Sequence, residues 1–551
     1  MITKKNSQLY VILMLEFFIL FCFTLITLSY FPIYPDEIAS RLWISRTLFD
    51  FPLRTNLFPA CESYIQSLSV VWYVPGVIEN IVHGFVVDLF TLRIIGIISY
   101  LLMFGLLVNL FMISYNNIRY AYILKLEETS LSAPAIVLSL ISIGVAPFFL
   151  VTNRQEQIIL ISLLALLNLL LFTQKKTPRR LASRYLIAIS YIFFTTLIWY
   201  AHPKGLLLSP IIFAIGFYLL QSLFTKKMSY ILLILITWLM WMNYAAWSDA
   251  LKCQSSPTVN QAITSYNVDL KNIKQHPLSV ISQLRTSAFN VLKEVDEIRF
   301  QAQAELNYLP PINLNIFDYI VNQLIFFNCI GISCWIICIL LLRANQHNEN
   351  QTVILVYTFI ISEILNISIN LTKNWYDSGY TYMLLIITFI YSLTRFNNYP
   401  FARKQGQAFL SYFVLCSIMS LLLLNYHYFS ALKSGYNGPG ISLANYHYNK
   451  LVLALKKAEQ TCEIDTANDQ GIIVDDLTYG YFQHAKHPIL ITYLFYPETP
   501  TLKNKLISSN KISGTVVRCT SLPVAIRANA RQNRDLCCFT KNQTKRIFNI
   551  Q

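Results

Sequence analysis

Charged residues are scarce in this chain. They make up 13% of its 551 residues, whereas 55% are hydrophobic. A soluble globular protein has about 25% charged residues. The composition therefore excludes an ordinary soluble protein and indicates one that crosses a membrane several times.

The sequence also lacks several motifs that carry chemistry elsewhere. It has no Walker motif, no glycine-rich phosphate loop, no internal repeat and no CxxC pair. Without a CxxC pair, zinc binding is a weaker interpretation of the cysteines than disulfide formation. Without a repeat, the paired halves that are common in transporters are not supported.

Long apolar stretches are what the chain does contain. We predict about eleven spans, because each stretch is long enough to cross the hydrocarbon core. The first lacks a small-residue cleavage site, so we interpret it as a retained anchor. The predicted spans lie at 9–31, 90–114, 133–151, 158–173, 185–201, 205–223, 229–247, 316–342, 351–371, 379–394 and 407–425.

The basic residues predict the orientation of these spans, because short cytoplasmic loops retain Lys and Arg. Every second loop is basic, starting with Lys4 and Lys5 at the N-terminus, which we place in the cytoplasm. Fifteen cations lie in the predicted cytoplasmic segments, and residues 426–551 carry a further 15 Lys and Arg against 8 Asp and Glu. Because topology already explains the cytoplasmic cations, we expect no nucleic-acid partner. The predicted class is an all-α polytopic membrane protein with a transmembrane domain at 1–425. Its outer loops lie at about 32–89 and 248–315, the second with an amphipathic run at 280–300.

Residues 426–551 are predicted to form a small extracytoplasmic α/β domain. A helix is expected at 444–461 and short strands at 471–476, 489–495 and 515–519. Six cysteines fall outside the membrane in this topology, which favours disulfides in an oxidising compartment with the pairing left open. They are Cys61, Cys253, Cys462, Cys519, Cys537 and Cys538. We favour a bacterial inner membrane over the endoplasmic reticulum, because only the sequon at Asn542 lies in a clearly soluble outer segment.

Candidate site residues gather at the outer ends of the spans. Pro32 and Pro35 end the first span, which places Asp36 and Glu37 in a rigid turn at the outer face. Short outer loops that need no charge nevertheless carry Arg154, Glu156, His202, Lys204, Lys373 and Asp377. Polar interfacial loops without a function are the simpler alternative for any one of them.

Three of these segments resemble motifs of the GT-C superfamily of membrane glycosyltransferases. Pro35-Asp36-Glu37 is similar to the acidic motif of the family's first outer loop. Asn153-Arg154-Gln155-Glu156 and His202-Pro203-Lys204-Gly205 are similar to turns in bacterial members. The resemblance covers the first 210 residues by motif and the remainder by architecture. The superfamily uses polyprenyl- or dolichyl-phosphate sugars and includes the protein O-mannosyltransferases and aminoarabinose transferases.

The resemblance implies transfer of a sugar from a polyprenyl-phosphate donor to a lipid, glycan or protein hydroxyl, with inversion. It implies Asp36 as the general base, with Glu37 orienting the acceptor or tuning the pKa of Asp36. Donor phosphate would be bound by Arg154, Lys204, Lys373 and Arg54, and substrate positioned by Glu156, His202, Tyr376 and Asp377. No cofactor is required, although Mg²⁺ or Mn²⁺ bridging Asp36 and Glu156 is an alternative.

Other classes stay open at this stage. A polysaccharide polymerase or ligase has closely related chemistry and would place its essential groups in the 248–315 loop. A transporter or flippase would also carry ionisable residues in its spans. A non-catalytic scaffold would make the acidic pair at Asp36 and Glu37 dispensable.

Overall fold

The computed structural model describes a set of ranges that covers most of the predicted spans. The ranges are 4–29, 54–55, 65–66, 89–117, 132–152, 154–175, 180–251, 275–296, 316–343, 350–371, 375–393, 412–426, 448–465, 471–475, 478, 482, 487–490, 512–533 and 536–548. Most of the first outer loop therefore lies outside the described residues.

Helices are found within every predicted span. They are α1 (Lys4–Ser29), α4 (Leu89–Asn117), α5 (Ser132–Ile141), α6 (Ala146–Val151), α7 (Gln155–Lys175), α8 (Leu181–Ala201), α9 (Ser209–Leu223), α10 (Lys226–Leu251), α13 (Ile316–Arg343), α14 (Asn350–Ile367), α15 (Trp375–Leu393) and a further helix at 412–426. In the described ranges, six helical segments are long and apolar enough to cross a membrane. They are Ile94–Met112, Gln155–Gln174, Leu181–Ala201, Pro203–Leu223, Lys226–Ser248 and Ile316–Cys334. The chain is a multi-pass membrane protein, and the count of about eleven spans stays a prediction.

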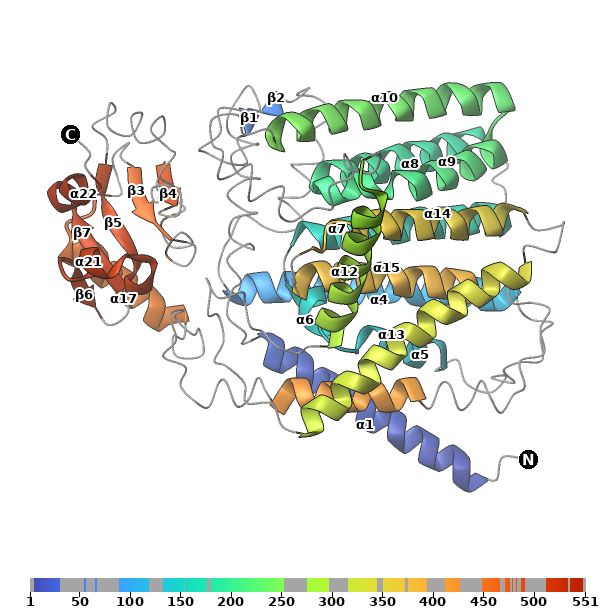
Figure 1. Cartoon of the computed structure of the whole chain (residues 1–551), viewed down its shortest axis with the longest axis horizontal. Helices are drawn as coiled ribbons and strands as arrows, with labels where there is room; N and C mark the ends of the chain where they lie inside the picture. The colour runs from blue at the N-terminus through green and yellow to red at the C-terminus, as the bar shows by residue number, and fades with distance from the viewer. Residues whose placement is uncertain are drawn as a thin grey trace.

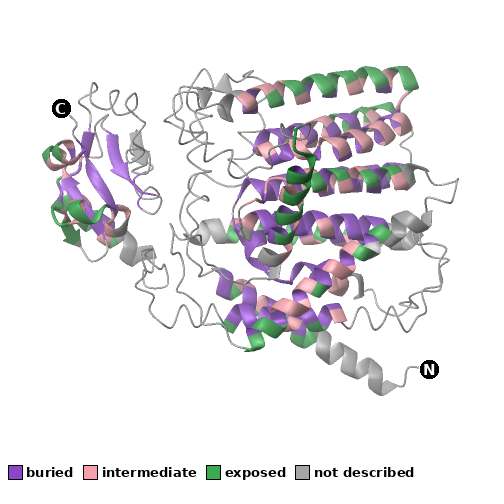
Figure 2. Cartoon of the chain, in the orientation of Figure 1, coloured by how far each residue is buried: buried purple, intermediate pink, exposed green. Residues whose placement is uncertain are grey.

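Most of these helices run side by side, with α7 near the middle of the bundle, whereas α1 and α13 are inclined to the others (Figure 1). α7 contacts α4, α8 and α9, and its apolar segment is mostly buried. Helix α10 lies at the edge and turns large apolar side chains outward, among them Ile234, Trp238 and Trp241 (Figure 2). An apolar face open to the surroundings is what a membrane-spanning helix presents to lipid. The buried centre therefore lies around α7.

The third predicted span is not one continuous helix. Helices α5 and α6 are separated at Gly144, which has φ 60°. Glycine adopts this left-handed conformation without a steric penalty, and the Gly144 N–H donates to Ser420 Oγ at 2.8 Å. Pro147 is the second residue of α6, in the first turn, where its missing N–H is not needed. The prediction of one helix over 133–151 is thus corrected to two.

The second outer loop contains α12 (Pro277–Asp296), which overlaps the predicted amphipathic run at 280–300. It crosses the direction of the spans (Figure 1) and contacts α13, α14 and α15. Buried Asn290 donates its amide N–H groups to the carbonyls of Asn370 and Leu371 at 3.2 and 2.8 Å. Helix α12 therefore fixes the chain at the end of α14, just before α15 begins.

The C-terminal region forms a five-stranded sheet in the order β4-β3-β5-β7-β6. Its strands are β3 (Gly471–Val474), β4 (His487–Leu490), β5 (Ile512–Arg518), β6 (Arg531–Asn533) and β7 (Leu536–Thr540). Strand β3 is parallel to β4 and β5, and β7 is antiparallel to β5 and β6. The helices are α17 (Tyr448–Thr461), α21 (Val524–Arg527) and α22 (Lys541–Ile547). The predicted helix and three strands are found with shifted ends, whereas β6 and β7 were not predicted.

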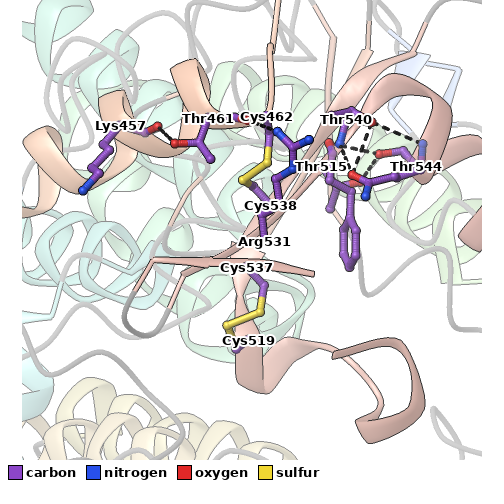
Figure 3. Close-up of a disulfide and its surroundings, with 12 residues drawn as sticks. Lys457, Thr461, Cys462, Thr515, Cys519, Arg531, Cys537, Cys538, Thr540 and Thr544 are labelled. Atoms are coloured by element: carbon purple, nitrogen blue, oxygen red, sulfur yellow. Dashed lines mark hydrogen bonds between the residues drawn. A yellow bond between two sulfur atoms is a disulfide. The ribbon is translucent and has the colours of Figure 1, made fainter. Parts of the chain in front are cut away.

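Two disulfides hold this sheet to its surroundings (Figure 3). Cys462, just after α17, is bonded to Cys538, and Cys519, just after β5, is bonded to Cys537. Cys537 and Cys538 are neighbours in β7, so their side chains point to opposite faces of the sheet. The expectation of disulfides among the outer cysteines holds for these four. Cys61 and Cys253 lie outside the described residues.

Candidate functional site

The site is formed where α7 and α15 begin and where α8 ends. Arg154 lies just before α7, and Glu156 is in the first turn of that helix. The turn from α6 into α7 is held by buried Gln157, whose side-chain amide donates to the carbonyls of Leu150, at 2.7 Å, and Thr152. These bonds satisfy carbonyls that a helix end leaves without partners. The positions of Arg154 and Glu156 are therefore fixed by main-chain contacts.

Lys204 is held by a short 3₁₀ helix, η1 (Pro203–Leu208), directly after α8. His202 Nδ1 accepts the main-chain N–H of Lys204 at 3.2 Å and caps η1. At Gly205 a Cβ atom would lie 1.9 Å from the carbonyl oxygen of Ile198, so only glycine fits against α8. This close packing sets the position of Lys204 relative to the end of α8.

Four charged side chains meet at this point. The Arg154 guanidinium donates through Nε and Nη2 to the two carboxylate oxygens of Glu156, at 3.2 and 3.3 Å. Lys204 Nζ donates to Glu156 Oε1 at 2.6 Å and also forms an ion pair with Asp377 Oδ1. All four residues are buried. We call Arg154, Glu156, Lys204 and Asp377 the ion cluster.

Two tyrosines of α15 cover the cations of the ion cluster. The Arg154 guanidinium carbon lies 3.8 Å from the ring centroid of Tyr376. Lys204 Nζ lies 5.0 Å from the same centroid and 5.6 Å from that of Tyr380. Tyr376 and Tyr380 are four residues apart and share one face of the helix. Ring faces attract cations at these distances, so α15 contributes both an anion and two aromatic rings.

The ion cluster contains two cations and two anions, and its formal charges cancel. Cancellation is needed because an unpaired charge in a buried place is strongly unfavourable. His202 adds no charge, since burial lowers its pKa to about 3, with the positive charges of Lys204 and Arg154 acting in the same direction. A neutral His202 also fits its role as acceptor of the Lys204 N–H. Within the ion cluster, the cations are thus kept charged while the formal charges of its four side chains cancel.

The structure brings together six of the residues predicted from the sequence. They are Arg154, Glu156, His202, Lys204, Tyr376 and Asp377. Asp36, Glu37 and Lys373 lie outside the described residues, as does the side chain of Arg54. The backbone of Arg54 is in β1 (Arg54–Thr55), which pairs with β2 (Ile65–Gln66), and β2 contacts α10. Helix α10 also contacts η1.

Sequence reasoning missed three contributors to the site. Gln157 shapes the turn before α7, Asn290 fixes the end of α14, and Tyr380 faces Lys204. Tyr380 had a detectable signal, because it follows Tyr376 by one helical turn. The other two depend on contacts with other elements and have no local pattern.

A divalent cation at Glu156 would compete with the cations that already contact this carboxylate. Both carboxylate oxygens of Glu156 accept hydrogen bonds from Arg154, and one also accepts from Lys204. A metal ion at Glu156 would have to displace these cations or lie beside them. In the described part of the chain, no group of three or more His, Cys, Asp or Glu side chains is placed to hold a metal.

Comparisons with known proteins return structures and no sequence relatives. No protein-family model matches the chain, and no curated protein matches it by sequence. The archaeal oligosaccharyltransferase AglB from Archaeoglobus fulgidus, solved with an inhibitory peptide and a dolichol-phosphate, matches with 13% identity and a TM-score of 0.38. That match covers 92% of this chain and 69% of AglB. A second structure of the Archaeoglobus fulgidus oligosaccharyltransferase, tethered to an acceptor peptide, has 12% identity and a TM-score of 0.37, with coverages of 88% and 65%.

The third structure is ArnT from Cupriavidus metallidurans bound to undecaprenyl phosphate. It has 12% identity and a TM-score of 0.38, and the match covers 97% of this chain and 98% of ArnT. We base the function on the residues of the site and not on these three likenesses.

Proposed function

We propose that the chain is an integral membrane glycosyltransferase that moves a sugar from a polyprenyl-phosphate donor to an acceptor hydroxyl on the extracytoplasmic face. The observation that carries this proposal is the ion cluster, which holds two buried cations at the ends of apolar helices. The phosphate of a lipid-linked sugar lies at the membrane surface, between the acyl chains and water. In this proposal the helix ends that carry the ion cluster lie at that surface too. Cations that are held in place there suit a leaving group that becomes more negative during the reaction.

In this proposal the two cations have different roles. Arg154 offers a planar set of donors that matches two phosphate oxygens, whereas Lys204 acts as a point charge. Glu156 and Asp377 hold these cations in position before the donor arrives. Donor phosphate would then replace part of the carboxylate contacts. Lys373 and Arg54 are further candidates for the phosphate, and His202 and Tyr376 for positioning the substrate.

Asp36 is our proposed general base, with Glu37 orienting the acceptor or adjusting the pKa of Asp36. The acceptor oxygen forms a bond to the anomeric carbon while the bond from that carbon to the phosphate oxygen breaks. The electron pair leaves with the lipid phosphate, and the hydroxyl proton passes to the Asp36 carboxylate. Attack from the side opposite the phosphate inverts the anomeric configuration. No metal ion takes part in this scheme.

The two disulfides support the extracytoplasmic side for the C-terminal domain. Disulfides persist in oxidising compartments and are rare in the cytosol, and both lie after the helix at 412–426. We further propose that the transmembrane domain ends at residue 425, that the soluble domain begins at 426, and that the protein lies in a bacterial inner membrane. The acceptor is a lipid, glycan or protein.

Binding of bare polyprenyl phosphate tests the role of the cations. Arg154→Gln, measured in lipid nanodiscs, should bind it at least about 10-fold more weakly than wild type, because a charged hydrogen bond is lost. Arg184→Gln is the matched control. Arg184 lies near the start of α8, at the end of that helix opposite His202, and its Nη1 donates to the Leu223 carbonyl. Equal affinity of wild type and Arg154→Gln would contradict the phosphate role of the cluster.

A further inference from the structure

Helix α12 exposes large apolar side chains on the face that points away from the bundle. Leu278, Ile281 and Phe289 are 80%, 62% and 53% exposed. Their positions in the sequence place them on one side of the helix, and Figure 2 shows α12 with much of its surface exposed. A helix in a soluble loop presents polar residues to water. The outward face of α12 is therefore not suited to water.

The opposite face of α12 packs against the protein. Val280, Ser287 and Val291 are buried on that side, and the helix contacts α13, α14 and α15. A helix with apolar side chains on both faces needs an apolar environment on each of them. The bundle supplies one of these environments. The other has to come from outside the chain.

α12 lies against membrane-spanning helices and crosses their direction (Figure 1). One of them, α13, contains the segment Ile316–Cys334, which is long and apolar enough to cross a membrane. α13 and α14 also expose apolar side chains of their own, among them Tyr319, Ile320 and Ile364. The lipid that surrounds these spans is thus the nearest apolar environment for the outward face of α12.

A cation lies in the same outward row. Arg285 is exposed on α12 between Ile281 and Phe289. An arginine can leave its apolar stem among acyl chains while its guanidinium reaches the lipid phosphates. Apolar side chains and a cation on one helix face are typical of a helix that lies in the membrane interface. A phospholipid, with its acyl chains and its anionic phosphate, matches both kinds of group.

Asn290 connects α12 to the ion cluster. Its amide donates to the carbonyls of Asn370 and Leu371 at 3.2 and 2.8 Å, just after α14. Carbonyls at the end of a helix have no partner within that helix, so α12 supplies the donors. α15 begins four positions after Leu371, and Asp377 of the ion cluster lies in its first turn. A shift of α12 would therefore move the segment that leads to Asp377.

We propose that Leu278, Ile281, Arg285 and Phe289 form a phospholipid-binding face, which holds α12 in the membrane interface and through Asn290 keeps the start of α15 in place. The partner is the phospholipid of the surrounding bilayer. The inference goes beyond the proposed function and needs only a membrane around the spans. It stands whether or not the protein transfers a sugar.

Photo-cross-linking in nanodiscs of phosphatidylethanolamine and phosphatidylglycerol tests the contact with lipid. Leu278→p-benzoylphenylalanine places a photoreactive group on the outward face, and mass spectrometry after irradiation detects a phospholipid adduct. The matched control is Val524→p-benzoylphenylalanine in α21 of the C-terminal domain, because Val524 is 78% exposed and Leu278 is 80% exposed. Trp241, exposed on α10, is the position for a positive control. We expect adducts at Leu278 and Trp241 and none above background at Val524.

Amide hydrogen exchange in the same nanodiscs tests the connection to α15. The double variant Leu278→Gln/Ile281→Gln removes two apolar contacts with lipid, so exchange in peptides covering 366–371 and 375–380 should become about 5-fold faster or more. Ser282→Gln is the control, since Ser282 is exposed on the same helix and no apolar side chain is lost. We expect the control to exchange like wild type.

Four results would overturn the inference. They are no adduct at Leu278 where Trp241 gives one, equal adducts at Leu278 and Val524, a cross-linked dimer in place of a lipid adduct, and unchanged exchange in the double variant. The dimer would assign the face to a second copy of the chain. None of these results changes the expected effect of Arg154→Gln on polyprenyl-phosphate binding, so failure here is distinguishable from failure of the proposed function.

Discussion

Replacing Lys204 by methionine tests how the ion cluster holds its charges. Lys204 is the only partner of the Asp377 carboxylate among the residues that the structure describes, and it shares Glu156 with Arg154. Lys204→Met leaves Asp377 buried and unpaired, and breaking a buried pair in this way is unfavourable by about 3–5 kcal/mol. Glu156 retains Arg154, so the loss should not exceed that range.

The partner substitution should have a smaller effect. Asp377→Asn leaves Lys204 paired with Glu156, and we expect a loss of about 1–3 kcal/mol for the weakened contact. In the double variant Lys204→Met/Asp377→Asn, neither side chain of the pair is charged and the Arg154–Glu156 pair is neutral. Its free energy of unfolding should therefore exceed that of Lys204→Met alone, by about 2 kcal/mol.

The assay is reversible unfolding in mixed micelles of a neutral detergent and dodecyl sulfate, analysed as a double-mutant cycle. A second measurement on the same proteins is the affinity for polyprenyl phosphate. The double variant should regain stability but not affinity, because the cation that meets the phosphate is still missing. Additive losses in the cycle would refute the coupling between Lys204 and Asp377. Full recovery of affinity would refute a direct role for Lys204.

Three further predictions address the scaffold of the site and the C-terminal domain. Gly205→Ala should reduce both thermal stability and polyprenyl-phosphate binding, since its Cβ meets the Ile198 carbonyl, whereas Gly105→Ala, with open space at its Cβ, should match wild type in both assays. Burial alone would raise the pKa of Asp475, but the charge of Arg518 and main-chain hydrogen bonds give a net lowering. Its stabilising effect should thus be complete above about pH 3.9, the ordinary Asp value, and disappear as the pH falls through the lower folded value. Asp475→Asn should remove this acid dependence, measured by limited proteolysis of the C-terminal domain against pH, and an unchanged profile would exclude Asp475 as its source. Removing Cys462–Cys538, which spans 76 residues, should destabilise the domain by about 4.5 kcal/mol, against about 3 kcal/mol for Cys519–Cys537, which spans 18. Paired Cys→Ala variants in chemical denaturation check this order, and the reverse order would contradict the loop-closure explanation.

Local sequence patterns predicted the positions of the helices well. Apolar length marks a span irrespective of its neighbours, and each predicted span contains a helix. The break at Gly144 was missed, although Gly144 and Pro147 are residues that commonly interrupt a helix. Strand β6 was missed because Arg531–Asn533 is short and polar and is a strand only through its pairing with β7.

Six of the residues named from the sequence lie together in the structure, but their contacts were not predicted. Charges at the ends of spans identified Arg154, Glu156, Lys204 and Asp377, because short interfacial loops have little reason to carry them. That Lys204 pairs with Asp377, 173 positions along the chain, depends on how η1 and α15 each pack against α14. Gln157 and Asn290 have no local sequence pattern, and only their contacts with other elements identify them.

Turnover of a radiolabelled polyprenyl-phosphate sugar in nanodiscs tests the proposed function most directly. Wild type should release or transfer the sugar and leave one polyprenyl phosphate for each sugar moved. Asp36→Asn should bind the donor but lose most of this turnover, because general base catalysis contributes about 10²–10⁴-fold. Equal turnover by the two proteins would remove Asp36 from its role. A folded wild type that neither binds nor turns over any such lipid would contradict the glycosyltransferase assignment itself.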